Sequence, residues 1–343
     1  MEDYIGFCVS EEHYPGLRLR LSERINTSSI NRTFIRFESH LVDFHHQLVA
    51  GERYDHNQNE WVIGTFPIPR VIFIQCKASP VFIRKIKEAS GAIVFNDFIF
   101  DKWQSWMILS RNQHLYPHLP ETRICRSVED INYFMESYKD FLIKPIMGDS
   151  SQGIVRINKK DSGYSEMFVT NEKDVTRKWF TPSKEFQHYL CTQYGNGEYV
   201  LQQKIQTISQ GEQVTDIRTN MNKNGAGEWE QSLLLFRIAT NSSVVIPKSI
   251  SAYLLKGFLN SRLYDQATMG DIEQSILHLA REICHTFDRS SFHMADFGID
   301  LGLDKAGKLW IFEVNPLPFP TNGAADNRPL SLPIQYADYL IKQ

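Results

Sequence analysis

The stretch DFGIDLGLDKAGKLWIFEVNPLP, residues 296–318, decides the fold of this chain. Apolar residues alternate from Phe297 to Leu303, which is the period of a half-buried β-strand. Residues 309–315 form a second strand-like run, and residues 304–307 between the two have the composition of a turn. The segment therefore predicts an antiparallel β-hairpin.

Three polar side chains on this hairpin are candidate metal ligands. Side chains alternate along a strand, so Glu313 and Asn315 point the same way. A register that sets Asp300 opposite Glu313 places their β-carbons about 5 Å apart, and like charges so placed repel unless a cation lies between them. Hard divalent cations such as Mg²⁺ prefer carboxylate and amide oxygens. The alternative is a surface hairpin with ordinary acidic residues.

Composition limits the classes of protein that fit. The 343 residues are 42% hydrophobic and 22% charged, which is ordinary for globular proteins and enough for two or three domains. A net charge of −3 favours neither nucleic acid nor an anionic membrane, so local basic residues must hold any anionic ligand. The sequence shows no signal peptide and no apolar run of about 18 residues. We therefore expect a soluble, cytoplasmic protein, with a homodimer left open.

The cysteines support this expectation. They are scattered, odd in number and contain no C-x-x-C, so we expect buried apolar side chains in a reducing compartment rather than metal ligands or disulfides. They are Cys8, Cys76, Cys125, Cys191 and Cys284.

Strand and helix signals predict an α+β arrangement rather than repeated βαβ units. Expected strands cover residues 4–9, 71–76, 92–95, 122–125, 141–145, 154–157, 166–170, 199–203, 214–221 and 229–239. Expected helices cover residues 80–89 and 128–137, a helix capped by Asp101, and a helix over 270–287 capped by Asp271.

A glycine loop at residues 148–153 has the spacing of a phosphate-binding loop. Ile154 and Val155 stand where a Walker A sequence needs Lys and Ser or Thr, which argues against a P-loop NTPase. A glycine loop between two strands can instead close over phosphates with its backbone N–H groups, and Lys144 on the preceding strand supplies a charge. The partial dinucleotide fingerprint at residues 195–200 reads as a hairpin turn.

Other catalytic constellations are not legible in the sequence. No Ser-His-Asp or Cys-His arrangement can be identified. His114 and His118 are four residues apart, but Pro117 between them disfavours a helical metal-binding pair. We therefore expect binding and electrostatics, rather than a covalent nucleophile, to carry the chemistry.

In order, these elements resemble the ATP-grasp superfamily over roughly residues 98–320. More narrowly they resemble the YheC/YheD group of endospore coat-associated ATP-grasp proteins. The segments that carry the resemblance are FIFDKWQ (98–104), HLPET (118–122), FLIKPIMGDSSQGIVRI (141–157), DIR (216–218) and FEVNPLP (312–318), with IPRVIFIQC (68–76) in the N-terminal part. The resemblance implies an ATP-grasp fold of two α+β subdomains, at residues 98–205 and 206–343, that clasp ATP and follow a small α/β domain at residues 1–97.

The resemblance also implies a role for each matching residue. Lys102 and Lys144 would contact the α- and β-phosphates. The loop Gly148, Asp149, Ser150, Ser151, Gln152 and Gly153 would close over the triphosphate. The hinge Gln202, Gln203, Lys204 and Ile205 would bind adenine, and Asp216 would reach the ribose. Asp300, Glu313 and Asn315 would hold one or two Mg²⁺ ions, with Mn²⁺ as an alternative. Arg218 and Arg237 would stabilise charge on the transferring phosphoryl group, although a cross-strand salt bridge is the other interpretation of each.

The implied activity is ligation of a carboxylate to an amine or thiol through an acyl phosphate, acting on small-molecule or peptide substrates. An ATP-binding structural or regulatory protein of the spore coat without turnover is a second hypothesis, and an ATP-grasp kinase is a third. Two departures from the superfamily pattern bear on this. Gln202 stands where many members have Glu, and the segment NSSVVIPKSISA (241–252) replaces a glycine-rich substrate segment, with Lys248 as a candidate anion contact.

Overall fold

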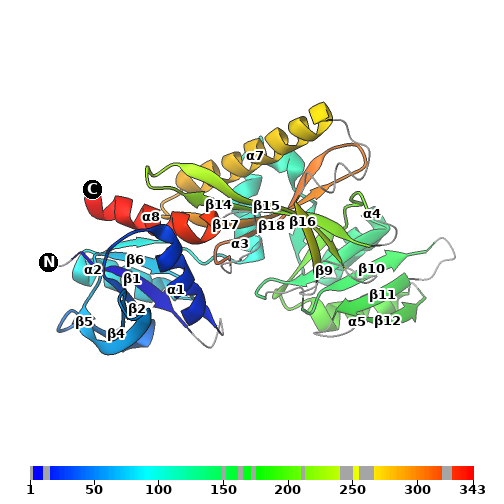
Figure 1. Cartoon of the computed structure of the whole chain (residues 1–343). Helices are drawn as coiled ribbons and strands as arrows, with labels where there is room; N and C mark the ends of the chain where they lie inside the picture. The colour runs from blue at the N-terminus through cyan, green and yellow to red at the C-terminus, as the bar shows by residue number, and fades with distance from the viewer. Residues whose placement is uncertain are drawn as a thin grey trace.

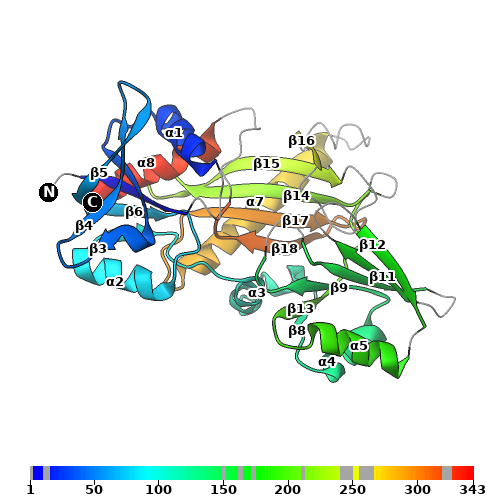
Figure 2. The same ribbon diagram turned by 90° about the horizontal axis from the view of Figure 1, so that it is seen from below.

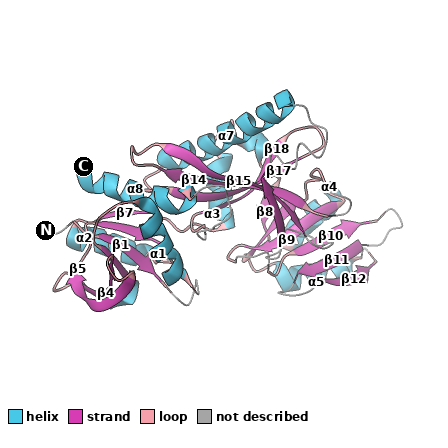
Figure 3. Cartoon of the chain, in the orientation of Figure 1, coloured by secondary structure: helices cyan, strands magenta, loops and turns pink. Residues whose placement is uncertain are grey.

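The protein is built from three β-sheets that follow one another along an elongated molecule (Figure 1). Helices cover the sheets (Figure 3, helices in cyan and strands in magenta). The computed structural model describes residues 3–10, 16–148, 152–160, 165–170, 175–181, 183–209, 213–239, 250–254, 266–318 and 327–343.

The first sheet has seven strands in the order β3-β4-β2-β1-β6-β7, with β5 on the outer side of β4. Strands β2, β1, β6 and the edge strand β7 are parallel, α1 connects β1 to β2, and α2 connects β6 to β7, so the expected α/β character of this region is confirmed. The elements are β1 (Ile5–Val9), α1 (Leu17–Ser28), β2 (Phe34–Glu38), η1 (Ser39–Leu41), β3 (Val42–Asp43), β4 (Leu48–Asp55), β5 (Glu60–Pro67), β6 (Val71–Ile74), α2 (Pro80–Ser90) and β7 (Ile93–Phe95).

The second sheet has six antiparallel strands in the order β12-β11-β10-β9-β13-β8. Helices α4 and α5 lie together against it (Figure 2). The elements are α3 (Lys102–Ser110), η2 (Tyr116–His118), β8 (Thr122–Ile124), α4 (Val128–Ser137), β9 (Asp140–Pro145), β10 (Val155–Lys159), β11 (Ser165–Thr170), β12 (Val175–Phe180), α5 (Lys184–Tyr194) and β13 (Tyr199–Gln203).

The third sheet has five antiparallel strands in the order β16-β15-β14-β17-β18. Helix α7 runs along one face of this sheet (Figures 1 and 2), and its apolar stripe packs against the inward residues of β14, β15, β17 and β18. Helix α3 joins the same core through Leu109. The elements are β14 (Thr215–Lys223), β15 (Trp229–Ala239), β16 (Ile250–Leu254), α7 (Gln266–Asp288), β17 (Asp296–Leu303) and β18 (Leu309–Asn315).

The last helix, α8 (Arg328–Lys342), returns to the first sheet and lies beside α1. Its buried side chains Ile334, Ala337 and Ile341 share one apolar core with β1 and β6. Both chain ends therefore lie at the same end of the molecule (Figure 1). The domain limits at residues 97 and 205 stay a prediction, since the sheets alone do not define independent folding units.

Two local expectations are wrong. Helix α7 begins at Gln266, so Asp271 is an interior residue and not its cap. An interior glycine costs only about 1 kcal/mol relative to alanine, so Gly270 does not end a helix with so long an apolar stripe. Gly195 is the C-cap of α5, so residues 195–198 connect a helix to a strand and are not a hairpin turn.

The sequence also left several elements unpredicted. The pattern did not predict helices α1, α5 and α8 or strands β2 to β5, β12 and β16. By contrast, Asp101 caps α3 as predicted, since its carboxylate accepts a hydrogen bond of 2.7 Å from the Gln104 backbone N–H. This cap fixes the start of the helix whose first residue is Lys102.

Candidate functional site

The acidic hairpin forms, and its register is the one that the candidate metal site requires. Asp300 of β17 pairs with Glu313 of β18, and Gly298 pairs with Asn315. The Asp304 carboxylate closes the turn by accepting hydrogen bonds of 2.9 Å from the backbone N–H groups of Ala306 and Lys308. Both the strands and the turn between them are therefore confirmed.

A β-bulge in β18 decides which residues face the site. Asp300 pairs with Glu313 but Leu301 pairs with Ile311, so Phe312 is an extra residue without a partner in the ladder. A bulge of this kind re-aims the residues that follow it. Ile311 belongs to the apolar core under α7 and also borders the pocket, whereas Phe312 and Glu313 line the pocket without belonging to that core.

Asp300 lies between two arginines. The Arg218 guanidinium, directly opposite on β14, donates from Nη1 to Asp300 Oδ1 at 2.8 Å, and Arg237 Nη2 lies 2.9 Å from the same oxygen. Arg237 also donates two hydrogen bonds, of 2.7 and 2.6 Å, to the Asp216 carboxylate opposite it. Both arginines thus form the cross-strand ion pairs that the sequence offered as one interpretation.

Burial and charge compete in this cluster. Burial opposes ionisation of Asp300, but Arg237 and then Arg218 outweigh it and hold the pKa of this carboxyl below its usual value. At Asp216 burial outweighs the favourable Arg237 charge and raises the pKa to about 6. The two carboxylates and two guanidinium groups together make a cluster without net charge at neutral pH.

Lys102 joins the glycine loop to the hairpin. Its Nζ donates a hydrogen bond of 2.7 Å to the Gly148 carbonyl and lies 3.5 Å from Glu313 Oε1. The two acids that face each other across the hairpin therefore have separate basic partners, with Lys102 beside Glu313 and the arginines beside Asp300. This arrangement relieves the repulsion that the sequence pattern predicted between them.

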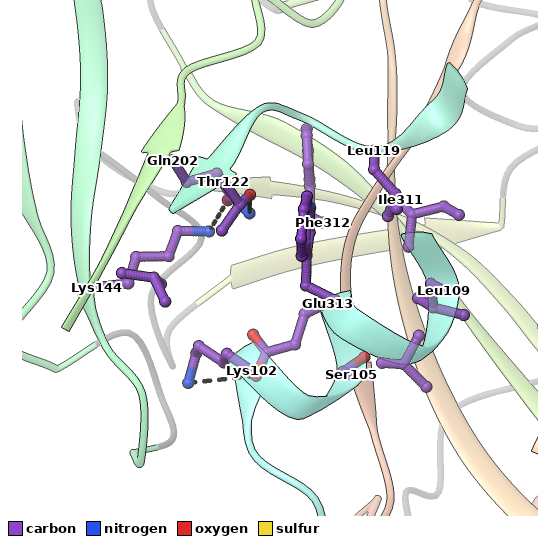
Figure 4. A pocket seen from close by; sticks show the side chains of 13 residues that line it. Lys102, Ser105, Leu109, Leu119, Thr122, Lys144, Gln202, Ile311, Phe312 and Glu313 are labelled. Atoms are coloured by element: carbon purple, nitrogen blue, oxygen red, sulfur yellow. Dashed lines mark hydrogen bonds and ion pairs between the residues drawn. The ribbon is translucent and has the colours of Figure 1, made fainter. Parts of the chain in front are cut away.

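Lys144 is buried at the end of β9 and is held by a chain of hydrogen bonds (Figure 4). Its Nζ donates to Gln202 Oε1 at 2.5 Å, and Gln202 Nε2 donates to Thr122 Oγ1 at 3.2 Å. Burial lowers the pKa of Lys144 to about 8. The Gln202 amide, expected at the adenine, therefore holds Lys144 in place.

The remaining hinge residues are tied to neighbouring strands. The backbone N–H groups of Gln203 and Lys204 donate to the carbonyls of Glu121 and Asp140, at 2.9 and 3.2 Å. The Lys204 ammonium donates to the Ile205 carbonyl at 3.0 Å, and burial lowers the pKa of Lys204 to about 8. The hinge is thus a fixed strand end, and its first residue, Gln202, lines the pocket.

The glycine loop lies next to Lys102 at its start. Gly148 and Gly153 have φ values of 143° and 68°, a region that favours glycine. A side chain at Gly153 would also come within 3.2 Å of Pro145. Gln152 lies in the turn that leads to β10, whereas Asp149, Ser150 and Ser151 lie outside the described residues, as does Lys248.

One pocket between the second and third sheets collects much of the predicted site (Figure 4). Lys102 and Glu313 lie at one end of it, and Lys144 and Gln202 at another. Its free volume is about 30 Å³, so a nucleotide base enters only when lining side chains move. Several lining residues were not predicted as site residues from the sequence, namely Ser105, Trp106, Leu109, Leu119, Thr122, Val200, Ile311, Phe312 and Val314.

The oxygen donors on the hairpin fit a hard divalent cation. Both arginines use Asp300 Oδ1, and neither Asp300 Oδ2 nor Glu313 Oε2 bonds with a residue that the structure describes. Asn315 Oδ1 accepts a hydrogen bond of 2.9 Å from the Leu317 N–H and keeps a second lone pair. Within the described ranges no three His, Cys, Asp or Glu side chains are grouped so that they could hold a metal ion. Asp300 and Glu313 supply only two carboxylates, so the Asn315 amide oxygen is needed as the third ligand.

The fold defines the class of this protein. It resembles VanG D-Ala:D-Ser ligase from Enterococcus faecalis, with a TM-score of 0.59 and 11% identity over 100% of this chain and 99% of that one. D-alanyl-alanine synthetase A from Vibrio cholerae gives a TM-score of 0.56 and 12% identity over 99% and 96% of the two chains. The architecture is therefore the mixed α+β ATP-grasp fold that the sequence predicted.

The chain belongs to the YheC/D-like ATP-grasp family, whose model matches residues 91–340. Two Bacillus subtilis proteins are similar to it. Endospore coat-associated protein YheD is 23% identical over 323 residues, which cover 89% of this chain and 70% of YheD. Endospore coat-associated protein YheC is 22% identical over 327 residues, covering 92% and 88%. The predicted resemblance to this group is thus confirmed.

Among the described residues, no helix is both long enough and apolar enough to cross a membrane.

Proposed function

We propose that this protein is an ATP-dependent ligase that joins a carboxylate to an amine or thiol through an acyl phosphate. One observation carries the proposal: Lys102, Lys144 and Glu313, from three separate elements, line one pocket between two sheets (Figure 4). A site of fixed positive charges beside carboxylates suits phosphoryl transfer, where positioning and electrostatics do most of the work.

The lysines would bind the α- and β-phosphates of ATP. Lys144 is buried, so its charge acts through a medium of low dielectric and attracts an anion more strongly than a solvated lysine does. Gln202 is neutral, so it fixes the Lys144 ammonium without cancelling its charge. Backbone N–H groups of the 148–153 loop would close over the phosphates from the other side.

The base would lie against the apolar lining of the pocket and the hinge at residues 202–205. Leu119, Ile311 and Phe312 supply this lining from both sheets. The ribose contact predicted for Asp216 competes with the two hydrogen bonds from Arg237, so we assign Asp216 to holding Arg237.

Asp300, Glu313 and Asn315 would hold one or two Mg²⁺ ions, or Mn²⁺, which would offset the charge of the phosphates. In the first step a substrate carboxylate oxygen attacks the γ-phosphorus and ADP leaves. Arg218 and Arg237 would stabilise the charge on the transferred group. In the second step an amine or thiol attacks the acyl carbon, a carbon–nitrogen or carbon–sulfur bond forms, and inorganic phosphate leaves.

The test is ADP release by the full-length protein with pools of carboxylic acids, each with and without amines and thiols. We expect turnover that needs both an acid and a nucleophile and that falls at least a hundredfold in Glu313→Gln. Lys305→Gln, in the exposed turn of the same hairpin, is the matched control and should keep full activity. Turnover with a hydroxyl acceptor alone would favour a kinase and contradict the ligase.

A second candidate is an ATP-binding protein of the spore coat without turnover. The neutral cluster of Asp216, Arg218, Arg237 and Asp300 favours it, since arginines already paired offer less charge to a transferring phosphoryl group. Both Bacillus subtilis relatives carry the name endospore coat-associated protein. ATP binding by calorimetry without ADP release from any acid and nucleophile pool would support this candidate over the ligase.

A further inference from the structure

Strand β17 carries a glycine on either side of Asp300. Phe297, Ile299, Leu301 and Leu303 point into the core under α7, so Gly298, Asp300 and Gly302 lie on the opposite face, toward the candidate site. Neither glycine has a positive φ, so the backbone there would accept any residue. Glycine inside a strand weakens it, and one recognised reason for its presence is the close approach of another group.

The space above Gly298 is filled by Arg218. A methyl group at position 298 would meet Arg218 Nε at 3.0 Å, with Cζ and Nη2 closer still. The guanidinium therefore lies flat across the glycine, and from there it reaches both Asp300 Oδ1 and, at 2.9 Å, Asn220 Oδ1. A side chain at 298 would displace the guanidinium at the end of the flexible Arg218 side chain and so disturb both contacts.

The space above Gly302 is filled by Phe312, the extra residue of the β18 bulge. A methyl group at position 302 would meet Phe312 Cε2 at 2.6 Å and Thr207 Cγ2 at 2.9 Å. The Phe312 ring stands in the middle of the pocket-lining side chains (Figure 4). The bulge and the glycine thus act together. The bulge turns the Phe312 ring to the site face of the sheet, and the missing side chain at Gly302 lets the ring pack against β17.

We propose that Gly298 and Gly302 are positioning residues of the nucleotide site. They hold Arg218 and Phe312 on opposite sides of Asp300, where Arg218 would contact the phosphate chain and the Phe312 ring would contact the base. The inference rests on the proposed function and goes beyond it, since it predicts that two alanine substitutions on one strand damage different halves of one ligand. A purely structural role for Gly302 would instead weaken the binding of the base and of the phosphates together.

The experiment compares two ligands in the presence of Mg²⁺, namely ATP and inorganic triphosphate, by isothermal titration calorimetry. We expect Gly302→Ala to weaken ATP binding about tenfold (~1.4 kcal/mol) and to leave triphosphate binding within twofold. Gly298→Ala should weaken both ligands by a similar factor, since the displaced Arg218 leaves Asp300 less compensated beside the phosphates. The matched control is Gly270→Ala, an exposed glycine of α7 with open space around it, which should change neither.

A second variant separates positioning from folding. A Phe312→Leu background makes room for the new methyl group, so Gly302→Ala should weaken ATP binding much less in that background than in the wild type, whatever the loss of the ring itself costs. The inference is overturned if folded Gly302→Ala keeps its ATP affinity, if it loses ATP and triphosphate equally, or if it weakens ATP binding as much in the Phe312→Leu background as in the wild type. It is also overturned if folded Gly298→Ala keeps its affinity for triphosphate. Wild-type protein that binds no ATP would overturn the proposed function as well, whereas wild-type binding with unaffected glycine variants overturns this inference alone.

Discussion

Asn96 ties the two ends of the acidic hairpin together, and its removal is the sharpest test of how the site is held. The side chain is fully buried and makes four hydrogen bonds to backbone groups. Its Nδ2 donates to the carbonyls of Asp296 and Pro316 at 2.9 and 2.8 Å, and its Oδ1 accepts from the N–H groups of Ala295 and Asp296 at 2.9 and 3.0 Å. One amide thus joins the start of β17 to the residue after β18.

The expected cost follows from these contacts. A buried hydrogen bond contributes about 1 kcal/mol net, so the four together stabilise the fold by about 4 kcal/mol. Asn96 also has a φ of 50°, where alanine costs about 1 kcal/mol more than a residue that tolerates the left-handed region. We therefore expect Asn96→Ala to lower the free energy of unfolding by about 5 kcal/mol, a large share of the ~5–15 kcal/mol that stabilises most domains.

The assay is urea unfolding followed by circular dichroism, at low temperature so that the variant remains folded at the start. Asn96→Gly is the matched control, because it loses the same four hydrogen bonds without the backbone strain and should be about 1 kcal/mol less damaging than alanine. Both variants should also bind ATP more weakly, since the hairpin that carries Asp300 and Glu313 is no longer fixed at its ends. A loss below about 1 kcal/mol for Asn96→Ala would refute this account.

Three further predictions concern single residues. Lys144→Met should weaken Mg-ATP binding at least tenfold at pH 7, and wild-type binding should weaken as pH rises through about 8, where Lys144 loses its charge, while the variant shows no such step in calorimetry. Lys204 has a folded-state pKa of about 8 and a normal value of 10.5, so the unfolded state holds the extra proton between these limits. Stability should therefore rise with pH from 8 to 10.5, and Lys204→Met should reduce that rise in urea unfolding, while Lys144, whose pKa is also about 8, keeps its own contribution. Asp101→Ala should cost about 1 kcal/mol by removing the cap of α3, and Asp101→Ser should restore most of it; no loss on alanine substitution would contradict the cap.

The local sequence pattern was enough to predict a strand where one face of that strand is buried. Alternation from Phe297 to Leu303 predicted β17 almost to its ends, and the structure has the register of Asp300 opposite Glu313 that the metal-site argument assumed. Asp101 was recognised as a cap because its partner is the backbone N–H three residues away. Such signals lie within a few residues of one another, so no knowledge of the fold is needed to read them.

Other features of the site have no local signal. The bulge at Phe312 is invisible in the sequence because the run 309–315 reads as an ordinary strand. The fit of Phe312 over Gly302 depends on which strand neighbours β17, and the Asn96 contacts join residues about 200 positions apart. Helix α8 was missed because its partners belong to the first sheet, at the other end of the chain.

The sequence by itself determined the acidic hairpin, the two lysines, the glycine loop and the family, because each is written in short segments whose side chains act through local geometry. Tertiary structure alone decided what each charge faces. It paired Arg218 and Arg237 with Asp300 and Lys102 with Glu313, and it brought Gln202 within hydrogen-bond distance of Lys144. The physical reason is that the net field at a buried site is the sum over all neighbouring charges and their burial, and those neighbours come from strands that only the completed fold brings together.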